Sequence, residues 1–499
     1  MLFSTWQFIL IFIPITWGLY FWLNHKRLIL AGKVVLVLAS LFFYAYWDIR
    51  YLPLILISIL FNFGIGTALT RQYPKDLLLQ EDSKRTYYRM LLLGLGISAN
   101  LLLLGYYKYS HFFISNLNTH FATSYNLPSI ILPLAISFFT FTQIVYLVDS
   151  YRGQTGKYDL LNYSLFVTFF PHLIAGPIVQ HQQIMPQFYS RWTLSWRASN
   201  VLRGLLIFSI GFFKKVVIAD TFAIYSDAGF DGNGPIDFFT AWATSLSYTF
   251  QLYFDFSGYC DMAMGAALLF NIWLPINFNS PYRALSIQDF WRRWHITLSH
   301  FLRDYLYIPM GGNRYSKYRT YITLFITFVL GGLWHGASWM FVLWGALHGL
   351  GLVVHRIWQQ LHLPLPKPFA WLLTFAFVNV TWVFFRAKTG EDALRILHGM
   401  VDIHSIYQPL SGAKSILSIS WSGWLGDVLL HLFPPSLVSQ LPIYLAIIFG
   451  FILIFQKNSV AVIQGRITTA KVVICALLFS AALLVSLTQT SSVFLYFNF

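Results

Sequence analysis

Long apolar runs recur along almost the whole chain and are separated by short polar segments. A helix that crosses a lipid bilayer needs roughly 20 consecutive, mostly apolar residues. The pattern therefore predicts an all-α, polytopic membrane protein with about 11–13 transmembrane or re-entrant helices. The predicted segments are residues 5–23, 29–47, 52–70, 90–107, 129–148, 202–219, 237–254, 257–273, 321–341, 341–358, 369–386, 440–455 and 470–487.

One further apolar segment carries residues that break helices. Residues 164–180 read SLFVTFFPHLIAGPIVQ, with an internal proline and a Gly-Pro pair. Proline lacks a backbone N–H and interrupts a helix, so we expect this segment to be broken or re-entrant. At membrane depth such a break is tolerated only where the backbone is buried in protein or lines a cavity.

The composition excludes an ordinary cytoplasmic enzyme. Hydrophobic residues make up 57% of the chain and charged residues only 10%, whereas soluble domains carry about 25% charged residues. No basic segment precedes the first apolar run, so we expect the first helix to stay as an anchor instead of being cleaved as a signal peptide.

The net charge of +15 comes from 33 Lys and Arg against 18 Asp and Glu. These basic residues gather near the ends of apolar runs, as the positive-inside rule describes, and their placement predicts an N-terminus on the outer side. There is no continuous basic stripe, so the expected partner is the lipid bilayer and not a nucleic acid. Cys260 and Cys475 lie in apolar runs without metal-ligand spacing, and we expect no bound metal.

Residues 281–320 form the least membrane-like segment of the second half. Ser286 and Asp289 match a capping box and predict a helix that starts near Ile287. Pro309 and Gly311 mark the end of this helix. Between these limits apolar residues recur at spacings of three and four, which predicts one amphipathic helix at the cytoplasmic interface. Its apolar stripe is Trp291, Trp294, Leu298, Phe301, Leu302 and Tyr305, and its polar face is Arg292, His295, Ser299 and Arg303.

This segment holds seven basic residues against two acidic ones. Two explanations stay open: the arginines touch lipid phosphates, or some of them hold a phosphorylated cytoplasmic substrate. Arginine suits phosphate because its planar fork can donate two parallel hydrogen bonds. The candidate phosphate-binding residues are Arg292, Arg293 and Arg303.

Two carboxylates and an amide interrupt the apolar pattern upstream. Asp255 and Asp261 lie in or near apolar helices, where a carboxylate needs a partner or a water-filled cavity. Either they organise the fold through such partners, or they line a substrate tunnel. Asn277 and Asn279 lie in a turn flanked by proline, where asparagine is common, and their side chains could orient a substrate; Asn279 is taken as the candidate.

The stretch FVLGGLWHGASWMF, residues 328–341, places His335 in what reads as the middle of a membrane helix. An ionisable side chain there is a functional hypothesis by default. An imidazole, with a pKa of about 6.5, suits a general base that takes the proton of an attacking hydroxyl in acyl transfer. His348, 13 residues further on, fits a structural histidine better than a catalytic one.

Two long stretches around these histidines resemble the membrane-bound O-acyltransferase family. They are DFWRRWHITLSHFLRDYLYIPMGGNR at 289–314 and LGGLWHGASWMFVLWGALHG at 330–349. Further stretches at 42–66, 137–153, 169–180 and 253–265 are similar as well, with the branch that O-acetylates bacterial polysaccharides such as alginate the most similar. We therefore expect one family domain over 1–499, with its best-supported core at 40–350 and less distinctive helices at 360–499.

The resemblance implies helices around a substrate tunnel in a bacterial inner membrane. It implies His335 as the catalytic base and His295 as the second essential residue. It also implies acetyl-CoA as a co-substrate, and no bound cofactor, with an exopolysaccharide of the alginate or cellulose type as the outer acceptor. The implied partner is a periplasmic transferase of the SGNH-hydrolase type or another polysaccharide-modification subunit. Residues 405–440, rich in serine, are expected to dock that partner or to serve as a connector.

Two alternatives stay open. The related D-alanyl transferases share the histidine motifs but take the acyl group from a carrier protein. A lipid or polysaccharide transporter would instead use His335 and the aspartates as a proton relay, and its polar residues should thread several helices. Here they concentrate in 250–350, which favours a single reaction site.

Overall fold

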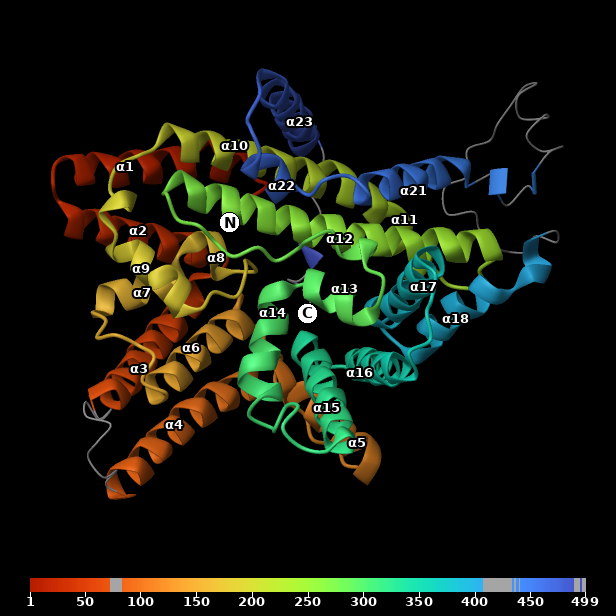
Figure 1. Cartoon of the computed structure of the whole chain (residues 1–499), viewed down its shortest axis with the longest axis horizontal. Helices are drawn as coiled ribbons and strands as arrows, with labels where there is room; N and C mark the ends of the chain where they lie inside the picture. Colours follow the sequence, from red (N-terminus) through yellow and green to blue (C-terminus); the bar gives the residue numbers. More distant parts are fainter. Residues whose placement is uncertain (72–82, 407–432, 435–436, 439, 489–493, 496–499) are drawn as a thin grey trace. The chain divides into compact units, whose positions relative to one another are not determined.

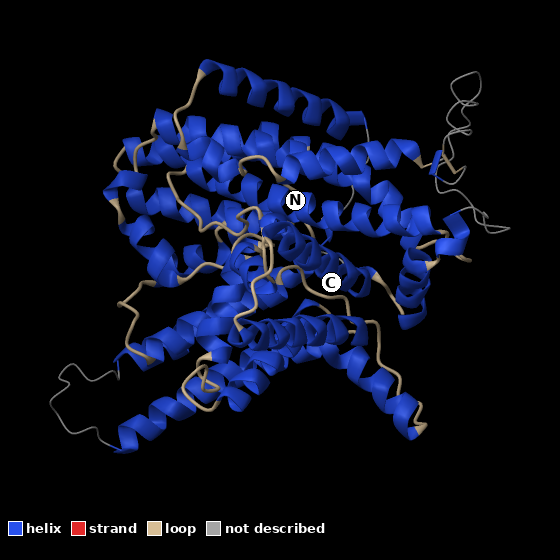
Figure 2. Cartoon of the chain, turned by 45° about the vertical axis from the view of Figure 1, so that its right-hand side comes forward, coloured by secondary structure: helices blue, strands red, loops and turns tan. Residues whose placement is uncertain are grey.

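The computed structural model describes residues 1–71, 83–406, 433–434, 437–438, 440–488 and 494–495. Within these ranges every regular element is a helix (Figure 2). The all-α prediction is therefore confirmed. Most of residues 405–440 lie outside the described ranges, so the docking role expected for that segment stays a prediction.

The described chain divides into two compact units. Unit 1 comprises residues 1–210, 259–276 and 469–476, and unit 2 comprises residues 211–258, 277–468 and 477–499. The prediction of one domain over 1–499 stays a prediction. Every side chain of the candidate site described below, apart from Asp261, belongs to unit 2.

Unit 1 consists of the N-terminal helices (Figure 1). They are α1 (Ile13–His25), α2 (Ile29–Ala45), α3 (Leu52–Arg71), α4 (Ser83–Leu104), α5 (Ser110–Phe121), α6 (Ile136–Tyr151), α7 (Leu160–Thr168), α8 (Phe170–Leu173), α9 (His181–Tyr189) and most of α10 (Ala198–Phe213).

Unit 2 carries the two histidine motifs on short helices and a helical hairpin. Its helices are α11 (Asp220–Phe230), the first part of α12 (Phe238–Leu269), α13 (Ile287–Arg293), α14 (Ile296–Leu302), α15 (Lys317–His335), α16 (Trp339–Leu361), α17 (Lys367–Arg386), α18 (Gly390–Val401), α21 (Leu441–Ile454), α22 (Ser459–Gln464) and the last part of α23 (Thr469–Thr488).

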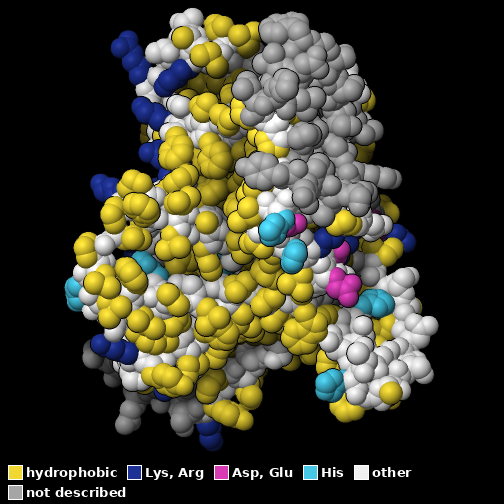
Figure 3. Space-filling view, turned by 90° about the vertical axis from the view of Figure 1, so that its right-hand side faces the viewer, with side chains coloured by type: hydrophobic (Ala, Val, Ile, Leu, Met, Phe, Trp, Pro, Cys, Tyr) yellow, Lys and Arg dark blue, Asp and Glu magenta, His cyan; other side chains and the backbone are white. Residues whose placement is uncertain are grey.

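Six helical segments of the described chain are long and apolar enough to cross a membrane. Two further apolar helices, α2 and α21, are shorter. Hydrophobic side chains cover much of the described surface on the face in Figure 3, as lipid-facing helices require. The six segments are Phe8–His25, Ile49–Arg71, Lys84–Phe121, Trp339–Leu361, Lys367–Arg386 and Thr469–Thr488.

The broken segment at 164–180 is confirmed. The helix α7 ends at Thr168, Phe169 leaves the helical conformation, and the short α8 follows. Residues 165–179 are all buried. The non-helical backbone is therefore enclosed by protein, which is the condition for tolerating it in a membrane.

Two boundaries differ from the predicted spans. The segments 237–254 and 257–273 were expected to be separate, but α12 runs through both without a break. The polar residues between them are accommodated: Asp255 pairs with Lys215, and Gly258 lets the backbone at Gly211 approach. The segment 321–341 is also not one helix, because α15 ends at His335.

Glycines allow the α15–α16 hairpin to close (Figure 1). A Cβ atom on Gly332 would lie 2.2 Å from the carbonyl oxygen of Phe341, and one on Gly345 would lie 2.3 Å from that of Phe328. Only residues without a side chain fit such an approach. This close approach brings together the ends of the two helices beside the turn that carries His335.

Candidate active site

His295 lies at a break between two short helices. The helix α13 begins at Ile287, as predicted, with the hydroxyl of Ser286 accepting from the N–H of Asp289. It ends at Arg293, however, and α14 begins only at Ile296. The prediction of one continuous amphipathic helix is wrong.

The backbone of His295 explains the break. It adopts a left-handed conformation with φ of 43°, which is uncommon and costly for a residue with a side chain. This turn moves the imidazole off the polar face where the periodicity placed it and buries it completely. Strain of this kind is typical of functional positions.

Asn277 fixes the protonation pattern of His295. Its Oδ1 lies 3.2 Å from the imidazole Nδ1 and also accepts from the N–H and the hydroxyl of Thr297. An oxygen can only accept, so Nδ1 carries the proton and Nε2 keeps its lone pair. Burial lowers the pKa of the His295 imidazole to about 3, so the ring is neutral.

The loop that carries Asn277 also stabilises the break between α13 and α14. The N–H of Ile296 donates to the carbonyl of Asn277, and the N–H of Asn279 donates to the carbonyl of Arg293. Both hydrogen bonds satisfy backbone groups that have no partner within the interrupted helix. The loop therefore holds the unusual backbone of His295 from both sides.

His335 is the last residue of α15, and not the middle of a membrane helix as expected. Gly336 is extended, and the hydroxyl of Ser338 accepts from the N–H of Met340 to begin α16. These residues end one helix and start the next within a tight turn. His335 is nevertheless buried, and the negative end of the helix dipole favours a positive charge at this position.

The two imidazoles lie together among aromatic rings. Their ring centroids are 6.4 Å apart. His335 contacts Trp344 at 5.1 Å and Phe385 at 5.3 Å, and His295 contacts Phe256 at 4.8 Å. The two imidazoles therefore belong to one buried aromatic cluster.

His348 has a structural position. The indole N–H of Trp291 donates to its Nδ1 at 3.1 Å, and its Nε2 lies 3.0 Å from the hydroxyl of Thr381. That hydroxyl donates onward to the carbonyl of Val378. Nε2 therefore carries the proton and both nitrogens are occupied, which agrees with the structural reading of this histidine.

The two adjacent arginines of the motif serve different pockets. Arg292, Arg303 and Arg356 line a cavity of about 370 Å³, which we call the Arg292 pocket; no acidic side chain of the described chain lines it. Arg293 lines a separate cavity and pairs with Asp289 at 2.8 Å. Successive residues of a helix point about 100° apart, which separates the two guanidinium groups.

Two of the remaining candidates, Asp255 and Asn279, are held by partners. Asp255 pairs with Lys215 at 2.8 Å and accepts from the N–H of Leu495. Asp261 is buried in unit 1. The side-chain oxygen of Asn279 accepts from Asn458 at 2.8 Å. Their roles in substrate binding stay predictions.

Comparison with known proteins decides the family. The sequence model of the membrane-bound O-acyltransferase family matches residues 41–388. The chain belongs to this family. It is thus an O-acyltransferase and a multi-pass membrane protein, as the motifs predicted.

Several relatives of this O-acyltransferase have curated functions. A peptidoglycan O-acetyltransferase of Helicobacter pylori is 45% identical over 100% of this chain and 98% of its own length. A probable alginate O-acetylase of Pseudomonas aeruginosa is 41% identical over 80% of this chain and 75% of its own. A teichoic acid D-alanyltransferase of Bacillus subtilis is 27% identical over 51% of this chain and 69% of its own.

Sequence reasoning missed the roles of three residues that shape the site. Asn277 was predicted as a turn residue that could orient a substrate and not as the partner of His295, although a polar amide in an apolar, proline-flanked run is a usable signal. Phe256 and Lys215 gave no such signal. Phenylalanine is common in this chain, and Lys215 sits beside a second lysine near a helix end, where basic residues are expected. Among the described residues, no group of three His, Cys, Asp or Glu side chains has metal-site geometry.

Proposed function

We propose that this protein transfers an acetyl group from cytoplasmic acetyl-CoA to a hydroxyl of peptidoglycan. The observation that carries the proposal is similarity over the whole chain to a peptidoglycan O-acetyltransferase. The sequence motifs alone pointed to alginate or cellulose. Alginate is the second candidate acceptor, supported by similarity to alginate O-acetylases over 80% of the chain.

The paired histidines support direct transfer. In the proposed step, the acceptor hydroxyl attacks the thioester carbonyl and its proton passes to His335, where the helix end stabilises the imidazolium. His295, with its lone pair on Nε2, accepts a hydrogen bond and orients the acceptor hydroxyl. Collapse of the tetrahedral intermediate breaks the carbon–sulfur bond, and the leaving thiolate takes the proton back from His335.

The Arg292 pocket supports a phosphorylated donor. Its cationic wall holds Arg292, Arg303 and Arg356, and its apolar floor includes Trp291. Trp291 contacts Trp344 at 5.8 Å, and Trp344 contacts His335 at 5.1 Å. A coenzyme A molecule with its phosphates in this pocket would thus be separated from the proposed base by two packed rings.

We further propose a bacterial inner-membrane location and a periplasmic partner of the SGNH-hydrolase type that completes transfer to the polymer. Transfer of D-alanine from a carrier protein has weaker support, since the D-alanyltransferases match only about half of the chain. The carrier protein's phosphopantetheine arm carries a phosphate as well, so the donor must be tested directly.

The acceptor is tested in bacteria that lack their own polymer O-acetylation. The protein is expressed with its neighbouring periplasmic transferase, and ester-linked acetate released by mild base is measured from purified peptidoglycan and, in an alginate producer, from alginate. Acetate on peptidoglycan alone supports the first candidate. Acetate on alginate alone replaces it with the second.

The chemistry is tested with purified protein in liposomes, acetyl-labelled acetyl-CoA, peptidoglycan as acceptor and the neighbouring periplasmic transferase. We expect label transfer by the wild type, and a loss of about 10²–10⁴-fold in rate for His335→Gln. If the wild type and His335→Gln transfer label at equal rates, His335 is not the base and His295 becomes the candidate. Transfer of labelled D-alanine from its carrier protein, with no transfer from acetyl-CoA, would overturn the proposed donor. No transfer from either donor would overturn the proposed acceptor.

A further inference from the structure

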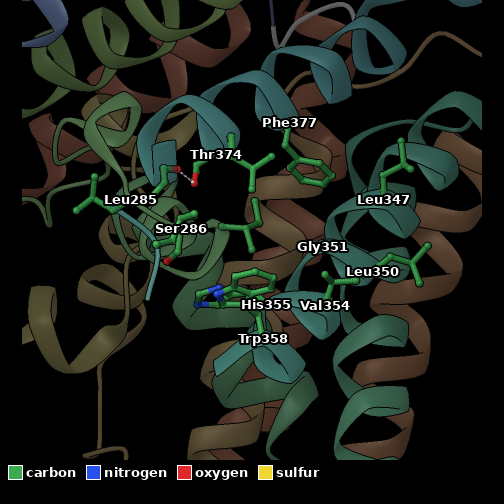
Figure 4. A pocket seen from close by; sticks show the side chains of 14 residues that line it. Leu285, Ser286, Leu347, Leu350, Gly351, Val354, His355, Trp358, Thr374 and Phe377 are labelled. Carbon is green, nitrogen blue, oxygen red and sulfur yellow. Dashed lines mark hydrogen bonds between the residues drawn. The ribbon is translucent and has the colours of Figure 1, made fainter. Parts of the chain in front are cut away.

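An apolar groove of about 420 Å³ runs along α16 and α17 in unit 2. Its walls include Leu347, Leu350, Val354, Leu373 and Phe377. Figure 4 shows the side chains of Leu285 and Ser286 on one side of the groove and those of Leu347 and Leu350 on the other. The groove is open, because Leu350, Val354 and Leu373 are all exposed.

The helices that form this groove are candidate membrane spans. Gly351 lets the ring of Phe377 pack against α16 in the wall of the groove, since a Cβ atom there would lie 2.8 Å from the ring. Trp358 lines the groove near the end of α16 and is partly exposed, the position that tryptophan prefers at a membrane surface. In a bilayer such a groove is filled by a hydrocarbon chain.

A cationic pocket of about 390 Å³ adjoins this groove. Arg283, Arg293 and Lys457 line it, and Asp289 is the one acidic side chain among its described lining residues. Three cations against one anion leave a formal charge of +2. Asp289 already pairs with Arg293 at 2.8 Å, while Arg283 and Lys457 are exposed. We call this cavity the Arg293 pocket.

Leu285 lines both the apolar groove and the Arg293 pocket. One molecule with a hydrocarbon tail and an anionic head can therefore occupy both. We propose that this is a binding site for an anionic glycerophospholipid, with an acyl chain in the groove and the phosphate in the Arg293 pocket. Basic pockets beside membrane helices bind such head groups.

The other candidates for the Arg293 pocket fit less well. Coenzyme A carries phosphates but no long hydrocarbon tail, and the Arg292 pocket is the cationic cavity beside the aromatic floor that leads to His335. A polysaccharide is too polar for a groove walled by leucine, valine and phenylalanine. The lipid site does not depend on the proposed reaction.

The first test is lipid binding by purified protein in a lipid-free detergent. Five compounds are titrated, and the amount of bound lipid and the thermal unfolding temperature of the protein are measured. The compounds are dioleoylphosphatidylglycerol, dioleoylphosphatidylcholine, dihexanoylphosphatidylglycerol, inorganic phosphate and acetyl-CoA. We expect dioleoylphosphatidylglycerol to bind at least about tenfold more tightly than the other two lipids, because only it supplies both charge and tail. Equal effects of the short-chain lipid or of phosphate would overturn the acyl chain's role, and displacement by acetyl-CoA would assign the pocket to the donor.

Variants locate the site. Arg283→Glu combined with Lys457→Glu should weaken binding of dioleoylphosphatidylglycerol about tenfold or more, at roughly 1 kcal/mol for each basic residue near an anionic surface. Val354→Trp, which fills the groove at an exposed position, should weaken it independently of charge. The matched control is Lys26→Glu with Arg71→Glu, two exposed basic residues of unit 1. If the control weakens binding as much as the pocket variants, the lipid binds nonspecifically and the proposal fails.

Discussion

Three buried histidines of unit 2 differ in what holds their ring nitrogens. His348 has both nitrogens engaged by Trp291 and Thr381. His295 has its Nδ1 held by Asn277, which leaves the lone pair on Nε2. His335 is the last residue of α15, and its ring centroid lies 6.4 Å from that of His295. We therefore propose that the close pair carries the chemistry and that His348 supports the core.

Substitution by glutamine distinguishes a histidine that only makes hydrogen bonds from one that acts as a base. An amide can accept from Trp291 through its oxygen and donate to Thr381 through its nitrogen, but it cannot act as a base at neutral pH. We expect His348→Gln to retain most of the acetyl-transfer activity, whereas His295→Gln and His335→Gln lose about 10²–10⁴-fold. The measurement is the initial rate of label transfer in liposomes. A loss of comparable size in His348→Gln would contradict its structural assignment.

Asn277 is expected to act as a positioning residue. In Asn277→Ala, the His295 N–H and the Thr297 N–H lose their acceptor in a buried site, at about 1–3 kcal/mol for each unsatisfied group. We expect the rate to fall about tenfold or more. Asn277→Asp keeps an acceptor oxygen and should recover part of the rate. If the alanine and aspartate variants are equally impaired, the hydrogen bond to His295 is not what matters.

At the scale of elements, the site depends on where helices stop. The turn between α15 and α16 and the break between α13 and α14 bring the two histidines together. Ser286 and the apolar periodicity predicted where α13 begins. The break after Arg293 was not predictable locally, because it depends on the loop at 277–279 that bonds to Arg293 and Ile296.

The α15–α16 hairpin gives an element-scale prediction. In Gly332→Ala the new methyl group would meet the carbonyl oxygen of Phe341, so the helices must separate. We expect a loss of about 1–3 kcal/mol in stability, seen as a lower thermal unfolding temperature in detergent, together with reduced acetyl transfer. Gly64→Ala in α3 is the matched control, since nothing lies within 4 Å of its Cβ position. Equal unfolding temperatures for the two variants would refute the close-packing argument.

At the scale of the whole molecule, a buried ion cluster joins segments that are distant in sequence. Lys215 lies 2.7 Å from Asp220 and 2.8 Å from Asp255. Asp255 also accepts from the N–H of Leu495, close to the end of the chain. Phe494 packs on Phe256, which in turn packs on His295. The described C-terminal residues thus belong to the support of the site.

Removing one charge from this cluster should destabilise the protein. Asp255→Asn removes one of the two carboxylates that hold the buried Lys215. Because Asp220 still compensates the charge, we expect a loss below the roughly 3–5 kcal/mol of an uncompensated buried charge. We expect a clear drop in the thermal unfolding temperature. Asp48→Asn, which breaks the surface pair with Arg50, should change it little. Similar unfolding temperatures for both variants would show that the cluster does not hold the fold.

The sequence by itself determined the class of the protein and the chemistry of its site. Hydropathy over about 20 residues specifies membrane helices, and the two histidine motifs specified acyl transfer. Both signals are local, so one stretch of chain contains them. The start of α13 and the break at 164–180 were predictable for the same reason, since capping residues and proline act on their neighbours.

Only the tertiary structure decided how these parts are used. It showed that Trp291 and Thr381 engage both ring nitrogens of His348 and that Asn277 sets the tautomer of His295. It also separated Arg292 and Arg293 into two pockets and made one helix of two expected spans. The physical reason is that a buried polar group must find a hydrogen-bond partner, and here those partners are distant in sequence: 277 with 295, 291 with 348, and 348 with 381.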